Sequence, residues 1–163
     1  MLINTLKFGP LEIPENKIIT MAKPVLGFEE LTKYCLVELE EFKPFMWLQS
    51  VNDPAVAFIV VNPAIFYNGY RIDINPNEIA EIEAKDPAHI ETYVIASVPN
   101  EWADMTINLQ GPILINTENN KAKQLVLVNS GYRIKHRVFD EEEKAAMTTK
   151  EPLEEVLEEP VGA

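Results

Sequence analysis

The sequence predicts a mainly β protein, a compact antiparallel β-barrel-like single domain with one or two short helices. About nine or ten short apolar runs follow one another at regular spacing, with turn-forming residues between them. Strands and helices do not alternate along the chain, which argues against a Rossmann-type parallel sheet and favours an antiparallel barrel or sandwich. A chain of 163 residues is long enough to bury a sizeable core in one domain.

The N-terminal part supplies the first strands and one hairpin. The run at residues 3–8 ends at Gly9-Pro10, which predicts an edge strand that stops at a turn. Two apolar runs separated by residues 52–54 predict a hairpin. Residues 57–61 are apolar on both faces, as in a strand covered on both sides or in a barrel wall. Further strands are expected at 17–23 and 34–39.

The middle of the chain is predicted to contain an internal helix. Residues 70–74 alternate between apolar and charged side chains, which predicts a half-buried strand. Asn75 can cap a helix and Pro76 suits its first turn, and Ile79 and Ile82 then follow at helical spacing. Residues 91–99 are expected to form a strand whose alternate side chains face opposite sides.

The last third of the body predicts a corner and a second hairpin. The run at 106–116 is broken by Gly111-Pro112, and proline cannot donate to a β-ladder, so an edge, a bulge or a corner is expected there. The runs at 124–128 and 132–139 flank Asn129-Ser130-Gly131, a hairpin signal. The folded body is therefore assigned to residues 1–139.

Residues 140–163 form an acidic C-terminal tail that is predicted to be partly helical or disordered. Residues 140–150 can extend a helix whose first turn is acidic, which the helix dipole favours. Leu153, Val156 and Leu157 lie at helical spacing between two prolines, but so short a helix is marginal alone in water. Two interpretations remain open: a solvated tail, or an amphipathic segment that docks on the body or on a partner.

The charge of the chain excludes some partners and favours others. The formal net charge is −12, of which the tail carries −7 and residues 1–139 carry −5. Direct binding of DNA or RNA is not expected, because nucleic-acid binders depend on Lys and Arg to displace counterions. A basic protein would be attracted. Arg133, Lys135 and Arg137 alternate along one predicted strand face, which either pairs with neighbouring acids or docks an acidic segment.

Catalytic and metal-binding patterns do not emerge. His89 and His136 lie in unrelated contexts, no metal-ligand spacing or nucleotide-binding loop occurs, and no cofactor is expected. Cys35 is the single cysteine, and its apolar surroundings predict a buried, inert thiol. With no signal peptide and no long apolar segment, the sequence indicates a cytoplasmic protein that is not embedded in a membrane.

An ordered series of segments resembles the flagellar assembly factor FliW family across residues 1–139. The segments are PVLGFEEL (24–31), PFMWLQS (44–50), AFIVVNP (57–63), Tyr70 with its strand, TINLQGPILIN (106–116) and QLVLVNSGYRIKHRV (124–138). The acidic tail is not part of this pattern. The resemblance implies a β-barrel-like protein without enzymatic activity that binds two proteins in the bacterial cytoplasm.

These implied partners are flagellin before export and the carbon storage regulator CsrA, a small basic dimer that represses translation by binding messenger RNA. Flagellin accumulating in the cytoplasm would occupy the FliW-like protein and leave CsrA to repress flagellin synthesis. Secretion of flagellin would release the protein to antagonise CsrA. The resemblance implies that this antagonism acts away from the RNA site, whereas charge alone does not distinguish it from RNA mimicry.

The residues proposed for protein binding lie in turns and corners: Asn52, Asp53, Trp102, Asn108 and Gln110. Polar residues at corners beside rigid strands are well placed for recognition, although each of them also suits a turn. Trp102 follows a polar loop, where an exposed ring would be a good anchor. Phe45, Trp47 and Phe58 lie in apolar runs and are expected in the core.

Two other functions remain possible from the sequence. A small β-barrel hydrolase that uses surface carboxylates would need a deep pocket with carboxyls whose pKa values are driven apart. A barrel that binds a small apolar ligand would need a lined cavity in place of a filled core.

Overall fold

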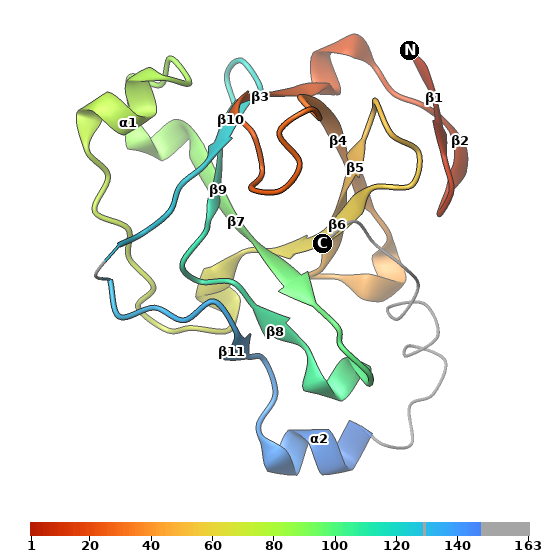
Figure 1. The fold of residues 1–163 in the computed structure, drawn as a ribbon, viewed down its shortest axis with the longest axis vertical. Coiled ribbons are helices and arrows are strands. Elements are labelled where there is room, and N and C mark those ends of the chain that lie inside the picture. Colours follow the sequence, from red (N-terminus) through yellow and green to blue (C-terminus); the bar gives the residue numbers. More distant parts are fainter. Residues whose placement is uncertain (129, 148–163) are drawn as a thin grey trace.

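Seven strands close into a β-barrel, as the sequence predicts. The structure, a computed structural model, describes residues 1–128 and 130–147. The barrel follows the order β7-β6-β5-β4-β3-β10-β9 and closes where β9 pairs with β7 (Figure 1). Its strands are β3 (Ile19–Lys23), β4 (Lys33–Glu38), β5 (Met46–Ser50), β6 (Ala57–Val61), β7 (Ile90–Ser97), β9 (Ile113–Asn116) and β10 (Lys121–Gln124).

Smaller elements lie around this barrel. A separate hairpin precedes it, β1 (Leu2–Thr5) with β2 (Gly9–Glu12), and β8 (Thr106–Ile107) and β11 (His136–Arg137) extend the sheet beyond β7. The helices are α1 (Pro76–Ala80) and α2 (Glu141–Met147). Single 3₁₀ turns are η1 (Glu15–Lys17), η2 (Glu40–Phe42), η3 (Pro63–Ile65), η4 (Pro87–His89) and η5 (Trp102–Asp104).

The antiparallel prediction holds for the barrel except at one pair. The predicted hairpin across residues 52–54 is confirmed, because β5 and β6 pair from Met46↔Val60 to Gln49↔Ala57. The pair β3–β10 is parallel, with Thr20 opposite Lys121. These two strands are far apart in the sequence and run in the same direction. Their pairing joins the N-terminal and C-terminal parts of the barrel wall.

The barrel wall separates two apolar cores. Alternate residues of β6 face opposite sides: Phe58 and Val60 fill the interior, whereas Ile59 packs outside, where η2, η5 and the β8–β11 pair cover the sheet. All five residues of β6 are buried, which confirms the prediction for 57–61. Trp47 and Phe45 lie in the outer core and Phe58 in the inner one, so the three aromatic residues predicted in the core are there.

A third apolar cluster holds the segment that contains α1 against the outside of β9. The predicted cap is confirmed, since Asn75 Oδ1 accepts the N–H of Asn77 at 2.9 Å. The helix is shorter than expected, because Glu83 adopts a left-handed conformation with φ 55° and ends the turn. Ile82 nevertheless packs against Leu114, so its spacing correctly identified the buried face.

Three other strand predictions were wrong in detail. The first strand was predicted to run to Gly9-Pro10, but β1 ends at Thr5 and Gly9 is the first residue of β2. The two strands pair with each other, with Thr5 opposite Gly9. Residues 70–74 alternate in burial as predicted but join no sheet. The hairpin around 129–131 does not form: β11 pairs with β8, and residues 125 and 127 bond to the 110–112 corner.

The beginning of the acidic tail is helical in the described part of the chain, since α2 starts with three glutamates. The second apolar segment predicted at 153–157 lies outside the described residues. Among the helices of the described residues, none is long and apolar enough to cross a membrane.

Candidate protein-binding surface

Asn52 and Asp53 lie in the β5–β6 turn, where their side chains organise the backbone. Asn52 Oδ1 accepts the N–H of Lys33 at 3.3 Å, and Asp53 Oδ1 accepts the N–H of Ala55 at 3.0 Å. The Ser50 hydroxyl accepts the N–H groups of both turn residues. The turn is therefore held at a fixed position with Asn52 exposed, while one acceptor on each side chain is already used.

Trp102 is buried, contrary to the exposed position that its polar loop suggested. Only 9% of its surface is exposed, and its ring meets Phe139 edge-on at 5.0 Å. Segments after β11 close over η5 and supply this cover, which the local sequence could not reveal. Its indole N–H is buried without an acceptor in the described residues. Trp102 in this conformation supports the outer core and offers no exposed ring to a partner.

Asn108 and Gln110 lie together in the corner between β8 and β9. Asn108 Oδ1 accepts the N–H groups of Gln110 and Gly111 at 3.1 and 3.0 Å. Gln124 reaches the same corner, because its Nε2 donates to Gly111 O at 3.0 Å and its Oε1 accepts the N–H of Leu26 at 2.8 Å. The corner predicted at Gly111-Pro112 is confirmed, and it joins three separate parts of the chain.

The five predicted residues do not form one cluster. Within the described residues, no hydrogen bond or ion pair connects the β5–β6 turn, η5 and the β8–β9 corner to one another. The structure keeps Asn52 with Asp53 in one turn and Asn108 with Gln110 in one corner, but it does not join these two sites to each other or to Trp102.

A surface that the sequence interpretation missed begins next to this corner, at residues 125–128. We call this extended segment the open edge. The N–H groups of Leu125 and Leu127 donate to Pro112 O and Gln110 O, both at 2.8 Å, while Val126 and Val128 point into solvent with 53% and 75% of their surfaces exposed. The alternating apolar run predicted a strand at 124–128, but β10 ends at Gln124 and residues 125–128 belong to no assigned strand. The predicted pairing of this segment with residues 132–139 was wrong, since β11 pairs with β8. That assumed partner would have covered the segment, so its exposure was not predicted.

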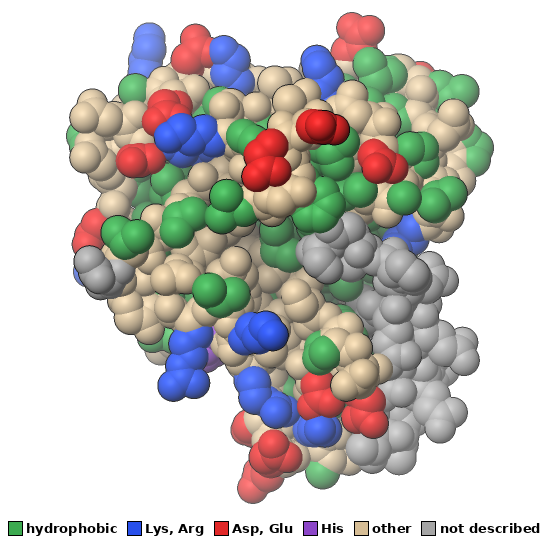
Figure 2. All heavy atoms as spheres, in the orientation of Figure 1, with side chains coloured by type: hydrophobic (Ala, Val, Ile, Leu, Met, Phe, Trp, Pro, Cys, Tyr) green, Lys and Arg blue, Asp and Glu red, His purple; other side chains and the backbone are tan. Residues whose placement is uncertain are grey.

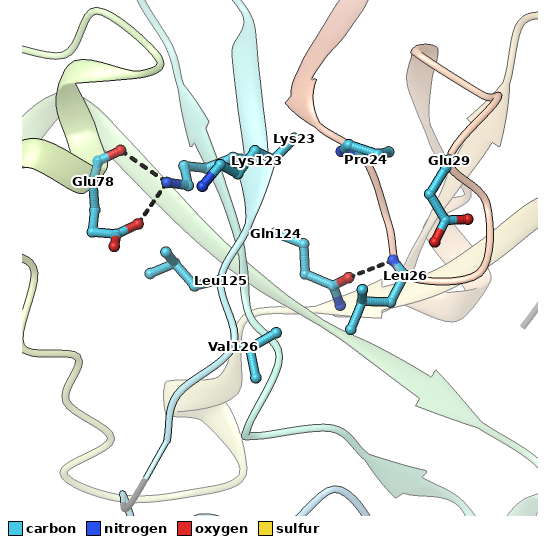
Figure 3. A pocket seen from close by; sticks show the side chains of 9 residues that line it. All are labelled: Lys23, Pro24, Leu26, Glu29, Glu78, Lys123, Gln124, Leu125 and Val126. Carbon is cyan, nitrogen blue, oxygen red and sulfur yellow. Dashed lines mark hydrogen bonds and ion pairs between the residues drawn. The ribbon is translucent and has the colours of Figure 1, made fainter.

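A hollow of about 400 Å³ lies beside the open edge, between it and the loop that follows β3 (Figure 3). Leu26 and Val126 line it together with Gln124. On its other side Lys123, with 0% of its side chain exposed, donates to Glu78 Oε2 at 2.6 Å and lies 3.3 Å from Glu81. Figure 3 shows this ion pair on one side of β10 and the Gln124–Leu26 hydrogen bond on the other.

Charged side chains surround this region without covering it. Figure 2 shows mostly uncharged atoms across the middle of this face, with charged groups above it and around β11 and α2 below. Partial desolvation alone would raise the pKa of Glu81, but hydrogen bonds and attraction to Lys23 and Lys123 outweigh it and lower the pKa. The face therefore combines a mostly uncharged centre with a charged rim. The exposed side chains of Leu26 and Val126 add apolar surface beside the hollow.

The predicted cation face at 133–137 is only partly neutralised by acids. Arg137 lies 3.6 Å from Asp104 and 3.7 Å from Glu141, so pairing with neighbouring acids is correct for this member. Arg133 and Lys135 are exposed, and no ion pair within the described residues includes them. Desolvation, with a contribution from Arg133, lowers the pKa of His136.

A second hollow, of about 700 Å³, opens at the end of the barrel where β3, β5 and β7 begin. Two carboxylates line it, and both are engaged: Glu38 lies 3.1 Å from Lys43, and Glu91 accepts the hydroxyl of Tyr93. Burial, with that hydrogen bond and the nearby carboxylates, raises the pKa of Tyr93. Deeper in the barrel, Tyr34 and Phe58 fill the interior, and burial raises the pKa of Tyr34 to about 12.

Neither a metal site nor an activated thiol emerges from the described residues. No three His, Cys, Asp or Glu side chains within them are placed to share a metal ion. Cys35 is buried as predicted, and desolvation raises its pKa, which keeps the thiol protonated.

Comparison with known proteins defines the family. A family model described as "FliW protein" matches residues 2–138. The chain belongs to the FliW family. The flagellar assembly factor FliW of Alkaliphilus metalliredigens (strain QYMF) is 37% identical over 145 residues, which cover 88% of this chain and 90% of that relative. The FliW of Thermoanaerobacter pseudethanolicus (strain ATCC 33223 / 39E) is 37% identical over 142 residues, covering 86% and 95%.

A solved FliW structure confirms the fold. A crystal structure of the flagellar assembly factor FliW superposes with a TM-score of 0.81 at 36% identity, covering 86% of this chain and 99% of that one. The resemblance drawn from the ordered segments is thus confirmed. The family match ends at residue 138, so the whole acidic tail, residues 140–163, lies beyond what this chain shares with the FliW model.

Proposed function

We propose that this FliW-family protein is a cytoplasmic flagellar assembly factor that binds flagellin and the translational repressor CsrA and has no catalytic activity. When flagellin is exported, the protein is released to bind CsrA and relieve repression of flagellin synthesis. When flagellin accumulates, it takes the place of CsrA. The output of this partner exchange is the rate of flagellin translation.

The observation that carries the proposal is an acidic barrel of the FliW family whose interior is packed with side chains. The net charge is −12, which favours rapid association with a small basic protein such as CsrA. A packed barrel leaves recognition to the outer surface, where hydrogen-bonded corners and exposed apolar side chains such as Val126 are available. If CsrA is held away from its RNA site, its RNA affinity falls by a coupling free energy of about 1–3 kcal/mol.

The decisive experiment is titration calorimetry of the purified chain with CsrA and with flagellin. We expect a complex with each, and a weaker CsrA complex as salt rises from about 0.05 to 0.5 M, because screening shortens the range of the charge attraction. Flagellin added to the CsrA complex should release CsrA. Absence of either complex at low salt would refute the proposal.

The predicted corner residues can be tested with a matched pair of variants. Asp53→Lys changes a carboxylate that accepts the N–H of Ala55, and Asp86→Lys changes one that accepts the N–H of Ala88 in the same way. Both reverse one charge and remove one equivalent hydrogen bond. We expect only Asp53→Lys to weaken a complex beyond the shared effect of charge, and equal losses would remove the β5–β6 turn from the binding surface.

Trp102→Ala tests the remaining prediction differently, because the ring is buried. We expect it to lower stability, and an affinity that is unchanged while the protein remains folded would exclude Trp102 from the binding surface.

A further inference from the structure

The backbone of the open edge has hydrogen-bonding groups that the described structure leaves unused. In an antiparallel pair, neighbouring residues direct their N–H and C=O groups to opposite sides. Leu125 and Leu127 donate their N–H groups to the carbonyls of Pro112 and Gln110, so this alternation directs the N–H groups of Val126 and Val128 away from the corner. No hydrogen bond within residues 1–128 and 130–147 satisfies the main-chain groups of these two valines. Such a row of unpaired groups is a template for another strand.

The side chains of the open edge are also unprotected. Natural edge strands usually carry Lys, Pro or a bulge that blocks pairing with another chain. The run Leu125–Val128 has neither charge nor proline, and its outward side chains are both β-branched. Leu125 packs inward on the cluster around Leu114, which anchors this end of the segment on the body. Val126 and Val128, with Leu26 at 65% exposure across the hollow, leave an apolar strip in solvent.

The hollow beside the edge exists because β3 ends early. β3 pairs with β10 as far as Lys23, then turns away at Pro24, and Gln124 holds its continuation through the N–H of Leu26. The edge that β3 would have covered opens into the hollow of about 400 Å³ (Figure 3). An added strand runs about 4.8 Å from its neighbour, which is the position that β3 vacates.

The charges around the hollow select the kind of segment. Its two lysines already have acidic partners, since Lys123 pairs with Glu78 and Lys23 lies 3.2 Å from Glu81. Glu29 lines the hollow and has no ion pair within the described residues. The unneutralised local charge on this side is therefore negative, as is the net charge of −12. This arrangement favours a cationic segment over an acidic one.

We propose that the open edge at residues 125–128 binds an extended, lysine- or arginine-bearing segment of a partner protein, which adds to it as a further β-strand. The proposal rests on the proposed function in that CsrA and flagellin are the first partners to examine. Main-chain hydrogen bonds to Val126 and Val128 would supply affinity, and alternate apolar side chains of the segment would contact the exposed valines. A cation near the end of the segment would pair with Glu29.

Hydrogen exchange of individual amides, followed by NMR, tests this binding mode directly. In the full chain alone, the Val126 and Val128 amides are expected to exchange much faster than those of Leu125 and Leu127, which are hydrogen-bonded. Saturation with the bound partner should slow the two valine amides by about 100-fold or more, because they then gain acceptors. Leu125 and Leu127 should change little. This alternation distinguishes strand addition from a surface that is merely covered.

Two variants separate the main-chain contribution from the side chain. Val126→Pro removes one outward N–H without disturbing the inward bonds of Leu125 and Leu127, and it should weaken the complex by about 5–10-fold, as loss of one hydrogen bond predicts. Val126→Thr keeps the N–H and the β-branched shape and serves as the matched control. Equal affinities for the two variants would overturn strand addition, provided that both give the thermal stability of the parent chain.

The outcomes distinguish this inference from the proposed function. A complex with CsrA or flagellin that leaves the valine amides fast overturns strand addition and leaves the proposed function intact. If neither protein binds, the proposed function fails, and a synthetic peptide of alternating Val and Thr flanked by Lys becomes the probe. Slowing of the valine amides by that peptide supports the inference, and its absence overturns it. Slow valine amides in the chain alone, with dimers in sedimentation, would assign the edge to a second copy instead.

Discussion

Replacing Gly111 by alanine should disrupt the corner that supports the open edge. An added Cβ would lie 2.9 Å from Asn108 Nδ2 and 3.0 Å from Gln124 Nε2, so both amides must shift. Each makes two hydrogen bonds at the corner, and a net hydrogen bond contributes about 0.5–1.5 kcal/mol. Alanine also lowers the conformational entropy of the unfolded chain, which offsets about 0.4–1 kcal/mol of the lost stability. Loss of two bonds then predicts a net cost of about 1–2 kcal/mol.

Urea unfolding followed by tryptophan fluorescence measures this cost, since Trp47 and Trp102 both lie in the outer core. A loss of that size should lower the Tm by roughly 2–8 °C in a chain of this length. A double-mutant cycle identifies the cause, because Gln124→Ala removes one of the two clashing amides. We expect Gly111→Ala to cost less by at least about 0.5 kcal/mol in the Gln124→Ala background. Additive effects of the two substitutions would refute the proposed steric mechanism.

Three further predictions follow from single contacts. Glu78→Gln should lower the free energy of unfolding in urea by about 1–2 kcal/mol, because it removes the shorter ion pair of the buried Lys123 ammonium. Lys123→Met should cost less, because it removes the buried charge itself and leaves none without a partner. A larger loss for Lys123→Met than for Glu78→Gln would contradict this account. Tyr132→Phe removes a hydroxyl that accepts the N–H of Arg71 and donates to the carbonyl of Arg71. We expect the free energy of unfolding to fall by about 1–2 kcal/mol. An unchanged value would show that the segment around Arg71 is held by ring packing alone. The pKa of His136 is lowered in the folded state, so the unfolded chain binds the proton first as the pH falls. The contribution of the neutral ring to the free energy of unfolding is therefore complete above about pH 6.5. It is lost as the pH falls through the lowered folded-state pKa. Thermal unfolding across that range should therefore depend less on pH in His136→Gln than in the parent chain, and identical slopes would exclude the contribution.

The barrel could be predicted from sequence because its signals are local. The β5–β6 hairpin follows from two apolar runs across residues 52–54, and the corner follows from Gly111-Pro112, where the ladder loses a donor. The closure between β7 and β9 and the parallel pair β3–β10 are contacts between distant segments, which no local period encodes.

The binding surface was less predictable for the same reason. The exposure of Trp102 depends on Phe139, which lies 37 positions along the chain and covers its ring. Residues 124–128 were predicted to be a strand, but β10 ends at Gln124. The turn signal at 129–131 suggested a partner segment that in fact pairs with β8. Whether a strand edge is covered depends on where the neighbouring strand ends, here at Lys23, and this is a property of the closed barrel.

An exposed apolar edge requires a reason why copies of the chain do not pair through it. The net charge of −12 supplies one, because two copies repel each other as they approach within a Debye length of about 8 Å at physiological salt. The same field attracts a cationic segment and speeds its encounter with the edge. The acidity that disfavours nucleic acid as a partner therefore has two effects at residues 125–128. It disfavours the pairing between copies that leads to aggregation. It also favours a cationic segment that can pair with Glu29, whose carboxylate makes no ion pair within the described residues.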